Sequence, residues 1–577
     1  MKKILSYIKP QRALALATVL VKFISTVVLL LIPHVLEYVV DDVVPTKSLW
    51  GVLLWGLVMV LLAVVERWLN LRSSQMSVKV AKSCTHALRR DLFAASIDLS
   101  GAQVDRFGLP SLTSRLTADV YNIQNFYQNL LTFAVRAPTL VLASIVLTLM
   151  LDARLALVLC VIAPVMVAVV AVVSVKGIPL FGNVQKKVDN ATRVLRENIT
   201  GVRVIKALSK EKHEINRFGK ANEELTRAEK TAGDVMSLPG PVATLLLNIG
   251  LVFIVLVGAR RVDSGAMQPG VILAFLTYFN MILMGVMGLN RVFMILSKAN
   301  ASANRIAAVM AQPEELPVSD QPSYTKDDGF VVFKDVSFRY GDGQSEDERQ
   351  MSLTDISFSV KKGGSLGIIG PTGSGKTTIV NLLMRFYDAT DGNVFVDGQD
   401  VRGYEKDDLR RRFGVVFQND SIFADTLAEN ISFGRDLAEE KVQNAAKDAM
   451  AKEFIEAYEE GYHHRVAAHG ADLSGGQRQR VLIARALAAN PEILILDDAS
   501  SALDYRTDAS LRNAIREHYS DTTTIVVAQR ISSIMDADEI LVLDEGRVIG
   551  RGSHEELLKT CSQYMDIYKT QMGEEVM

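Results

Sequence analysis

Six long apolar runs occupy the first half of the 577-residue chain and constrain its fold more than any other feature. A helix needs about 20 residues to cross the roughly 30 Å hydrocarbon core of a bilayer. Backbone inside lipid must also satisfy its own hydrogen bonds, which favours helices. The runs therefore predict six membrane-spanning helices. They lie near Leu14–Leu36, Leu49–Leu69, Leu131–Leu151, Leu155–Val175, Val242–Gly258 and Val271–Leu296.

The charges beside these runs predict how the chain is oriented in the membrane. An even number of spans places both ends of the membrane region on one side, and the basic segment Lys2–Arg12 favours the cytoplasm. We therefore expect a multi-pass protein of the plasma (inner) membrane, in contact with the lipid bilayer. By this count Arg260 and Arg261 lie on the outer side of the membrane, which weakens the charge argument without reversing it.

Two further features of the membrane half bear on function. The second-to-third and fourth-to-fifth connections keep a helical pattern over about sixty residues each, so long helices are expected to continue into the cytoplasm. Lys22 lies within the first span, where a charge is costly and usually functional. Its ammonium group either extends to the membrane surface or lines a substrate path.

The composition changes along the chain and indicates two domains. The second half reads as an ordinary soluble α/β domain, and 577 residues are too many for one core. A proline-rich polar stretch marks the boundary, which predicts a membrane domain at 1–311, a linker at 312–329 and a second domain at 330–577. The net charge of −2 is close to neutral and indicates no partner by itself, and we expect no nucleic-acid partner.

A glycine-rich loop opens the chemistry of the second domain. The apolar strand Ser365–Ile369 leads into Gly-x-x-x-x-Gly-Lys-Thr, and the helical stretch Ile379–Arg385 follows. Glycines let backbone N–H groups wrap phosphates, Lys376 neutralises β- and γ-phosphate charge, and the Thr377 hydroxyl can coordinate Mg²⁺. The predicted phosphate-binding residues are Gly370, Thr372, Gly373, Ser374, Gly375, Lys376, Thr377 and Thr378.

A second phosphate-binding pattern lies about a hundred residues further on. A Ser-Gly-Gly turn opens an amphipathic helix, and its free backbone N–H groups face an anion beside the positive end of that helix. The residues are Leu473, Ser474, Gly475, Gly476 and Gln477. An apolar strand, Ile493–Leu496, then ends in Asp497 and Asp498, and a carboxylate at the end of a buried strand suits Mg²⁺.

Together and in this order, these motifs resemble the ATP-binding cassette (ABC) transporters over essentially the whole chain. The fold implied is an α-helical six-span transmembrane exporter domain fused to an α/β P-loop ABC ATPase domain, that is, a half-transporter of the exporter type. ATP and Mg²⁺ are the implied cofactors, and the nucleotide-binding domain is cytoplasmic.

The resemblance also assigns roles to single residues. It implies that Tyr340 stacks on adenine, that Gln418 reaches Mg²⁺ and the attacking water, and that Asp504 communicates across a dimer. The implied metal ligands are Thr377, Gln418 and Asp497. In such dimers Leu473–Gln477 serve the ATP of the opposite chain. Two short coupling helices are implied near Leu99–Phe107 and Ser209–Arg217, the second docking on the partner's nucleotide domain.

Two departures from the family pattern fall in one catalytic site. Asp498 stands where the family has a glutamate that activates water. The aspartate side chain is one methylene shorter, which withdraws the carboxylate by roughly 1 Å and can lower the rate of hydrolysis about a hundredfold. Gln529 stands where the family has a histidine that contacts the γ-phosphate, and an amide carries no positive charge. A further departure lies at Val466–Gly470, just before the family's signature sequence, which here is Leu473–Gln477. It puts in doubt the usual contact of the Val466–Gly470 loop with a coupling helix.

These departures predict an asymmetric heterodimer with a second, different half-transporter. The P-loop of this chain would bind ATP and hydrolyse it weakly, whereas Leu473–Gln477 would complete a competent site on the partner. The predicted function is ATP-driven export of a small, amphipathic or drug-like substrate, most like the bacterial multidrug exporters. The alternatives are peptide or lipid export, a slow homodimer, and an ATP-gated regulatory or channel-like subunit without productive turnover.

Overall fold

The computed structural model describes residues 1–312, 316–319, 321–341 and 351–572. The chain forms two compact units. One comprises Met1–Asp98 and Leu109–Gln312, and the other comprises Leu99–Gly108 and Pro313–Met577. Part of the predicted linker, residues 313–315 and 320, lies outside the described residues.

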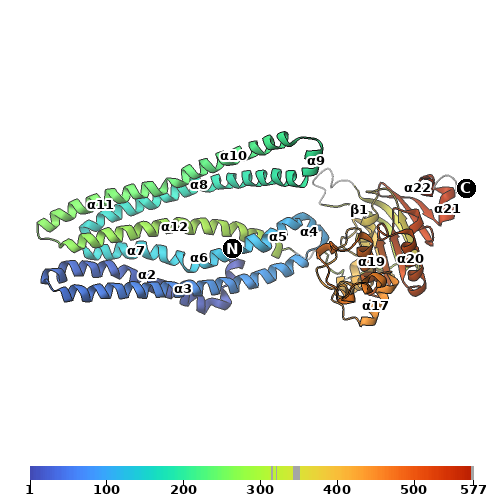
Figure 1. The fold of residues 1–577 in the computed structure, drawn as a ribbon, viewed down its shortest axis with the longest axis horizontal. Coiled ribbons are helices and arrows are strands. Elements are labelled where there is room, and N and C mark those ends of the chain that lie inside the picture. The colour runs from blue at the N-terminus through green and yellow to red at the C-terminus, as the bar shows by residue number, and fades with distance from the viewer. Residues whose placement is uncertain (313–315, 320, 342–350, 573–577) are drawn as a thin grey trace. The chain divides into compact units, whose positions relative to one another are not determined.

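The first unit is helical throughout (Figure 1). Its main helices are α2 (Arg12–Tyr38), α3 (Leu49–Ile97), α7 (Phe133–Leu151), α8 (Ala153–Thr200), α10 (Glu211–Ser237), α11 (Pro239–Asp263) and α12 (Pro269–Met310). Shorter helices are α1 (Lys2–Ser6), α5 (Leu109–Ser114), α6 (Val120–Leu131) and α9 (Val202–Ala207).

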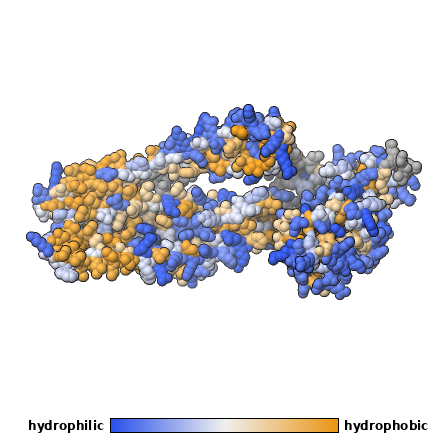
Figure 2. All heavy atoms as spheres, viewed as in Figure 1, coloured by the Kyte–Doolittle hydropathy of each residue, from blue (hydrophilic) through white to orange (hydrophobic). Residues whose placement is uncertain are grey.

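Apolar helical segments lie where the sequence predicts the six spans. Among the described residues, five helical segments are long and apolar enough to span a bilayer, and a sixth, Ala153–Val169, is shorter. The five are Lys3–Thr46, Leu49–Ile97, Leu109–Leu151, Glu211–Asp263 and Pro269–Met310. Hydrophobic side chains cover the end of this unit where α2 meets α3 and α11 meets α12, whereas α10 is hydrophilic (Figure 2).

The helices also extend well beyond the apolar segments, as predicted. α3 has 49 residues and α8 has 48, so each is about 70 Å long at 1.5 Å per residue, more than twice the hydrocarbon thickness. The prediction of a coupling helix at Ser209–Arg217 was wrong: the short helix is α9, and residues 211–217 belong to α10. Ser209 adopts a left-handed backbone (φ 51°) between them.

Two charged residues of the membrane half have specific partners. Lys22 on α2 is 5% exposed, and its ammonium group donates a hydrogen bond to the Asn70 side-chain oxygen on α3. The ammonium group is thus held between α2 and α3. Arg261, unexpected on the outer side, pairs with the largely buried Asp152 at 2.8 Å.

We expect Asn70→Leu to destabilise the helical unit because it leaves the buried Lys22 ammonium without its hydrogen-bond acceptor. A hydrogen bond to a charged group contributes about 1.5–3 kcal/mol. The double change Lys22→Met with Asn70→Leu should restore most of the loss, since removing both partners of a buried polar pair is often near neutral. Apparent melting temperature in detergent is the measurement.

Asn248→Leu is the matched control, because the Asn248 side chain is exposed and, among the described residues, bonds only to the Thr244 carbonyl of its own helix. Equal melting temperatures for the Asn70 and Asn248 variants would contradict a structural role for the Lys22–Asn70 contact.

The second unit contains two sheets. A four-stranded antiparallel sheet has the order β2-β1-β4-β5, and a six-stranded sheet has the order β10-β9-β3-β8-β7-β6. Within the larger sheet β9, β3, β8, β7 and β6 run parallel, and β10 is antiparallel. The carboxyl ends of these parallel strands meet at one edge, where ligands bind in open α/β sheets.

The elements of this unit follow in chain order. The strands are β1 (Val331–Phe338), β2 (Leu353–Val360), β3 (Ser365–Ile369), β4 (Asp391–Val396), β5 (Gln399–Asp400), β6 (Phe413–Val416), β7 (Ile493–Asp497), β8 (Thr523–Val527), β9 (Glu539–Asp544) and β10 (Arg547–Gly552). The helices are α4 (Gly101–Phe107), α14 (Lys376–Leu383), α15 (Lys406–Arg411), α16 (Leu427–Ser432), α17 (Glu439–Asp448), α18 (Lys452–Glu456), α19 (Gly475–Leu487), α20 (Tyr505–His518), α21 (His554–Thr560) and α22 (Ser562–Met572).

Helix α4 comes from the first half of the sequence but belongs to this second unit. A capping box at Ser100 begins it, within the predicted segment Leu99–Phe107. The Tyr387 hydroxyl donates a hydrogen bond to Asp105 at 2.6 Å. A Cβ at Gly101 would lie 3.0 Å from the Tyr387 ring, so the glycine allows this close approach.

Candidate active site

The P-loop connects β3, in the middle of the larger sheet, to α14. Gly373 and Gly375 have φ of 85° and 98°, a left-handed conformation that favours glycine. A Cβ at Gly370 would lie 2.1 Å from the Leu543 carbonyl, so glycine is required there for a close approach. The local chemistry thus explains the predicted spacing of these glycines.

The Lys376 ammonium lies over this loop and donates to the carbonyls of Gly370 and Pro371 at 2.9 and 2.8 Å. Burial lowers the pKa of Lys376, while Asp497 and Asp498 oppose that shift. A phosphate entering the loop would give this half-buried cation a full counter-charge.

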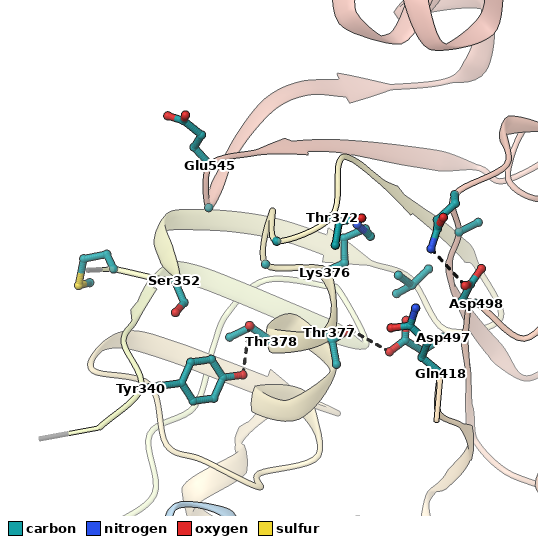
Figure 3. Close-up of a pocket in the computed structure, with 17 residues that line it drawn as sticks. Tyr340, Ser352, Thr372, Lys376, Thr377, Thr378, Gln418, Asp497, Asp498 and Glu545 are labelled. Atoms are coloured by element: carbon teal, nitrogen blue, oxygen red, sulfur yellow. Dashed lines mark hydrogen bonds between the residues drawn. The ribbon is translucent and has the colours of Figure 1, made fainter. Parts of the chain in front are cut away.

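A cavity of about 660 Å³ opens beside the loop (Figure 3). Its lining brings together Tyr340, Thr372, Gly373, Gly375, Lys376, Thr377, Thr378, Gln418, Asp497, Asp498 and Gln529 from the predicted set. Gly370 and Ser374 belong to the loop but do not line the cavity. The sequence reasoning missed Met351, Ser352, Val527, Ala528, Glu545 and Gly546. Glu545 follows β9, the neighbour of β3, so strand adjacency was the signal that could have found it.

Oxygen donors suited to Mg²⁺ gather at the floor of this cavity. The Thr377 hydroxyl donates to Asp497 at 3.1 Å, and Gln418 lies beside them (Figure 3). Asp497 is 2% exposed, and burial raises the pKa of its carboxyl. Among the described residues no three His, Cys, Asp or Glu side chains form a metal-binding group. A hydroxyl, a carboxylate and an amide fit the usual Mg²⁺ site, which takes its other ligands from phosphates and water.

The two unusual residues contact each other. Asp498 follows β7 and Gln529 follows β8, which are neighbouring parallel strands. The Gln529 amide donates to the Asp498 carboxylate at 3.2 Å (Figure 3). Burial raises the pKa of Asp498, and the Arg530 charge and a hydrogen bond from Gln418 oppose that shift. Asp498 also has a left-handed backbone, φ 54°.

The other end of the cavity is aromatic. The Tyr340 ring packs edge-on against Phe338 and Tyr387, with ring centroids 4.8 and 5.1 Å apart. Its hydroxyl lies 3.2 Å from the Thr378 hydroxyl. The ring is thereby fixed at the cavity wall, a position compatible with the predicted stacking on adenine.

The signature residues lie elsewhere in the same unit. Ser474 begins α19 with a capping box: the Gln477 backbone N–H donates to its hydroxyl, and its own N–H donates to the Gln477 side chain. Asp504 similarly caps α20 through Thr507. Neither Leu473–Gln477 nor Asp504 lines the cavity. The anion-binding helix end that the sequence predicts is therefore formed away from the P-loop of the same chain.

Comparison with known proteins gives separate matches for the membrane half and the ATPase half of the chain. The ABC transporter transmembrane region family matches residues 15–287, and the ABC transporter family matches residues 353–501. The ABC transporter ATP-binding protein YfiB of Bacillus subtilis is 34% identical over 580 residues, covering 100% of this chain and 99% of that protein. The chain belongs to the ABC transporter family. The transporter is a half-transporter of the exporter type, with a multi-pass membrane domain and a cytoplasmic ATPase domain.

Two further relatives widen the comparison. The ATP-dependent lipid A-core flippase of Hahella chejuensis is 31% identical over 581 residues, covering 99% of the transporter and 97% of the flippase. A bacterial Atm1-family ABC exporter solved with ATP bound superimposes with a TM-score of 0.81 and 26% identity, covering 99% of both chains. The transporter thus has the exporter fold and an ABC-type, ATP-hydrolysing domain that drives transport.

Proposed function

We propose that the transporter is one half of a heterodimeric exporter and carries its weakly hydrolysing nucleotide site. The contact between Asp498 and Gln529 carries this proposal, because it joins the two departures from the family pattern in one arrangement. The amide donates to one of the two oxygens of the carboxylate that a general base would offer to water. A base must lie within about 2.6–3.2 Å of the proton it removes, and the shorter aspartate side chain reduces that reach.

The signature residues support the second part of the proposal. Leu473–Gln477 keep the family pattern and form a capped helix start, yet they lie outside the cavity of their own chain. A helix start of this kind binds phosphate through its free N–H groups. We propose that these groups complete a competent site on a different half-transporter.

We further propose that Thr377, Gln418 and Asp497 hold Mg²⁺ and that Lys376 binds the β- and γ-phosphates. The metal ion would neutralise phosphate charge. For the sequence domains we retain 1–311, 312–329 and 330–577, which is compatible with α12 ending at Met310 and β1 beginning at Val331.

The substrate we propose is a small amphipathic or drug-like molecule, taken from the cytoplasmic side or the bilayer and exported. A lipid is the second candidate, and the relative named as a lipid A-core flippase favours it. Uptake into inside-out vesicles tests export: it should require hydrolysable ATP, whereas a channel-like subunit would conduct with ATP binding alone. Fluorescent cationic drugs and a labelled phospholipid in the same vesicles compare the two substrate classes.

We expect the full chain, purified alone in lipid nanodiscs, to bind MgATP but to release phosphate about a hundredfold more slowly than the complex with its partner. The reason is that both groups beside the attacking water are altered. Equilibrium binding and phosphate release are the measurements. Lys376→Ala is the control, since it should remove binding itself. Cooperative hydrolysis by the chain alone, at the rate of the complex, would overturn the heterodimer proposal.

A further inference from the structure

The last described helix, α22, is tied to the loop that carries Gln529. The Gln571 side chain spans this loop: its amide donates to the Gln529 carbonyl at 2.7 Å, and its oxygen accepts from the Ile531 N–H at 2.8 Å. One side chain thus bonds to the backbone on both sides of Arg530. Two short hydrogen bonds from a single planar amide fix both the position and the orientation of the loop.

The same helix contacts a second wall of the nucleotide cavity. The Gln563 amide donates to Asp544 at 3.0 Å, and the next two residues, Glu545 and Gly546, line the cavity. Between α22 and the P-loop lies a separate space of about 440 Å³, so α22 does not fill the region behind the loop. Polar contacts from its glutamines therefore supplement the apolar packing of Tyr564 and Ile567 against the ATPase core.

The contact of Gln571 with the loop does more than complete the end of a short helix. The Ile531 N–H begins the 3₁₀ turn Ile531–Ser533 and needs an acceptor, which Gln571 supplies. The second bond, to the Gln529 carbonyl, lies on the other side of Arg530 and is not required by that turn. It acts on the residue whose side chain reaches Asp498.

We propose that Gln571 is a positioning residue for the nucleotide site: it holds the Gln529 backbone so that the Gln529 amide faces Asp498 and the end of the bound triphosphate. This inference rests on the proposed function, which places Gln529 beside the γ-phosphate. A group that acts there affects a triphosphate and leaves a diphosphate untouched. The nucleotide preference of the site therefore depends on a residue of the C-terminal helix.

The test compares MgATPγS with MgADP on the full chain in nanodiscs. Gln571→Ala should lower the ratio of ATPγS to ADP affinity by about 3- to 10-fold, the effect of losing one or two ordinary hydrogen bonds. Gln571→Glu keeps an acceptor for Ile531 but loses the donor to Gln529, and it should lower the ratio as well. Thr570→Ala is the matched control, because within the part of the chain that the structure describes the Thr570 side chain bonds only to the Asp566 carbonyl of its own helix.

A structural role alone would change both affinities by the same factor or change only the melting temperature, and either result in folded protein would overturn the proposal. Amide hydrogen exchange of the unaltered chain gives a second measurement that needs no variant. The Ile531 amide should be protected, and exchange at the rate of a free amide would equally overturn the contact. If the unaltered chain binds no ATPγS while Ile531 is protected, the proposed function fails and the loop contact stands.

Discussion

In the complex of this chain with its partner, Gly475→Asp in this chain should lower the rate of ATP turnover a hundredfold or more. Gly475 is the first residue of α19, and a carboxylate there would place negative charge where the helix start binds phosphate. Removing one hydrogen-bond donor to a transition-state oxygen already lowers kcat by a factor of about 10²–10³. The fold should tolerate the change, because a Cβ at Gly475 would meet only Ala502 among the described residues, at an ordinary 3.6 Å.

Lys376→Ala in the same complex should have the smaller effect. It removes the ammonium from the P-loop of this chain, which in our proposal is not the site of fast hydrolysis, so a substantial part of the turnover should remain. Gly219→Asp is the control for the charge change, since no described residue lies within 4 Å of a Cβ at that exposed helical position. Loss of all turnover with Lys376→Ala but not with Gly475→Asp would reverse the assignment of the two sites.

The second large effect is expected from restoring the family residues. In a complex whose competent site is disabled through the partner's catalytic glutamate, Asp498→Glu alone should help little. The double change Asp498→Glu with Gln529→His should raise the rate of phosphate release by about a hundredfold, the lower end of the range of general-base catalysis. The two side chains form one hydrogen-bonded pair at 3.2 Å, and groups that act as a unit give non-additive effects.

Phosphate release from that complex is the measurement, and Asp498→Asn is the control that should gain nothing. A large gain from Asp498→Glu alone would mean that carboxylate reach was the only defect, and Gln529 would then have no part in the slow rate. Recovery should stay below the rate of the native competent site if the partner's signature also departs from the family pattern.

The sequence predicted the parts of the site that depend on local backbone chemistry. Gly373 and Gly375 need a left-handed backbone, so their spacing in the sequence reflects the loop itself. Asp497 ends a short apolar strand, and such strands are recognisable by composition. The adjacency of β3, β8 and β7 then brings the loop, Gln529 and the two carboxylates together.

Other features depend on contacts between distant segments and gave no local signal. Gln571 is an ordinary polar residue in a helix until the fold places it beside Ile531. Asn70 pairs with Lys22 across two helices. The second short helix was predicted near Ser209–Arg217 rather than at α9, because Ser209 adopts a left-handed backbone without a glycine or proline to indicate it. In α8, Pro164 and Pro179 lie inside one continuous helix, although proline more often ends a helix.

The membership of α4 in the ATPase unit changes what counts as a separable piece of this protein. The chain enters the ATPase unit at Leu99, leaves it after Gly108 and returns to it at Pro313, so three peptide connections join the two units. A fragment 330–577 would lack the helix that packs on Tyr387 and would expose that aromatic face to solvent. The ATPase is therefore a compact unit that is discontinuous in sequence, and an insertion between Leu99 and Gly108 would alter the ATPase although it lies within the membrane half of the sequence.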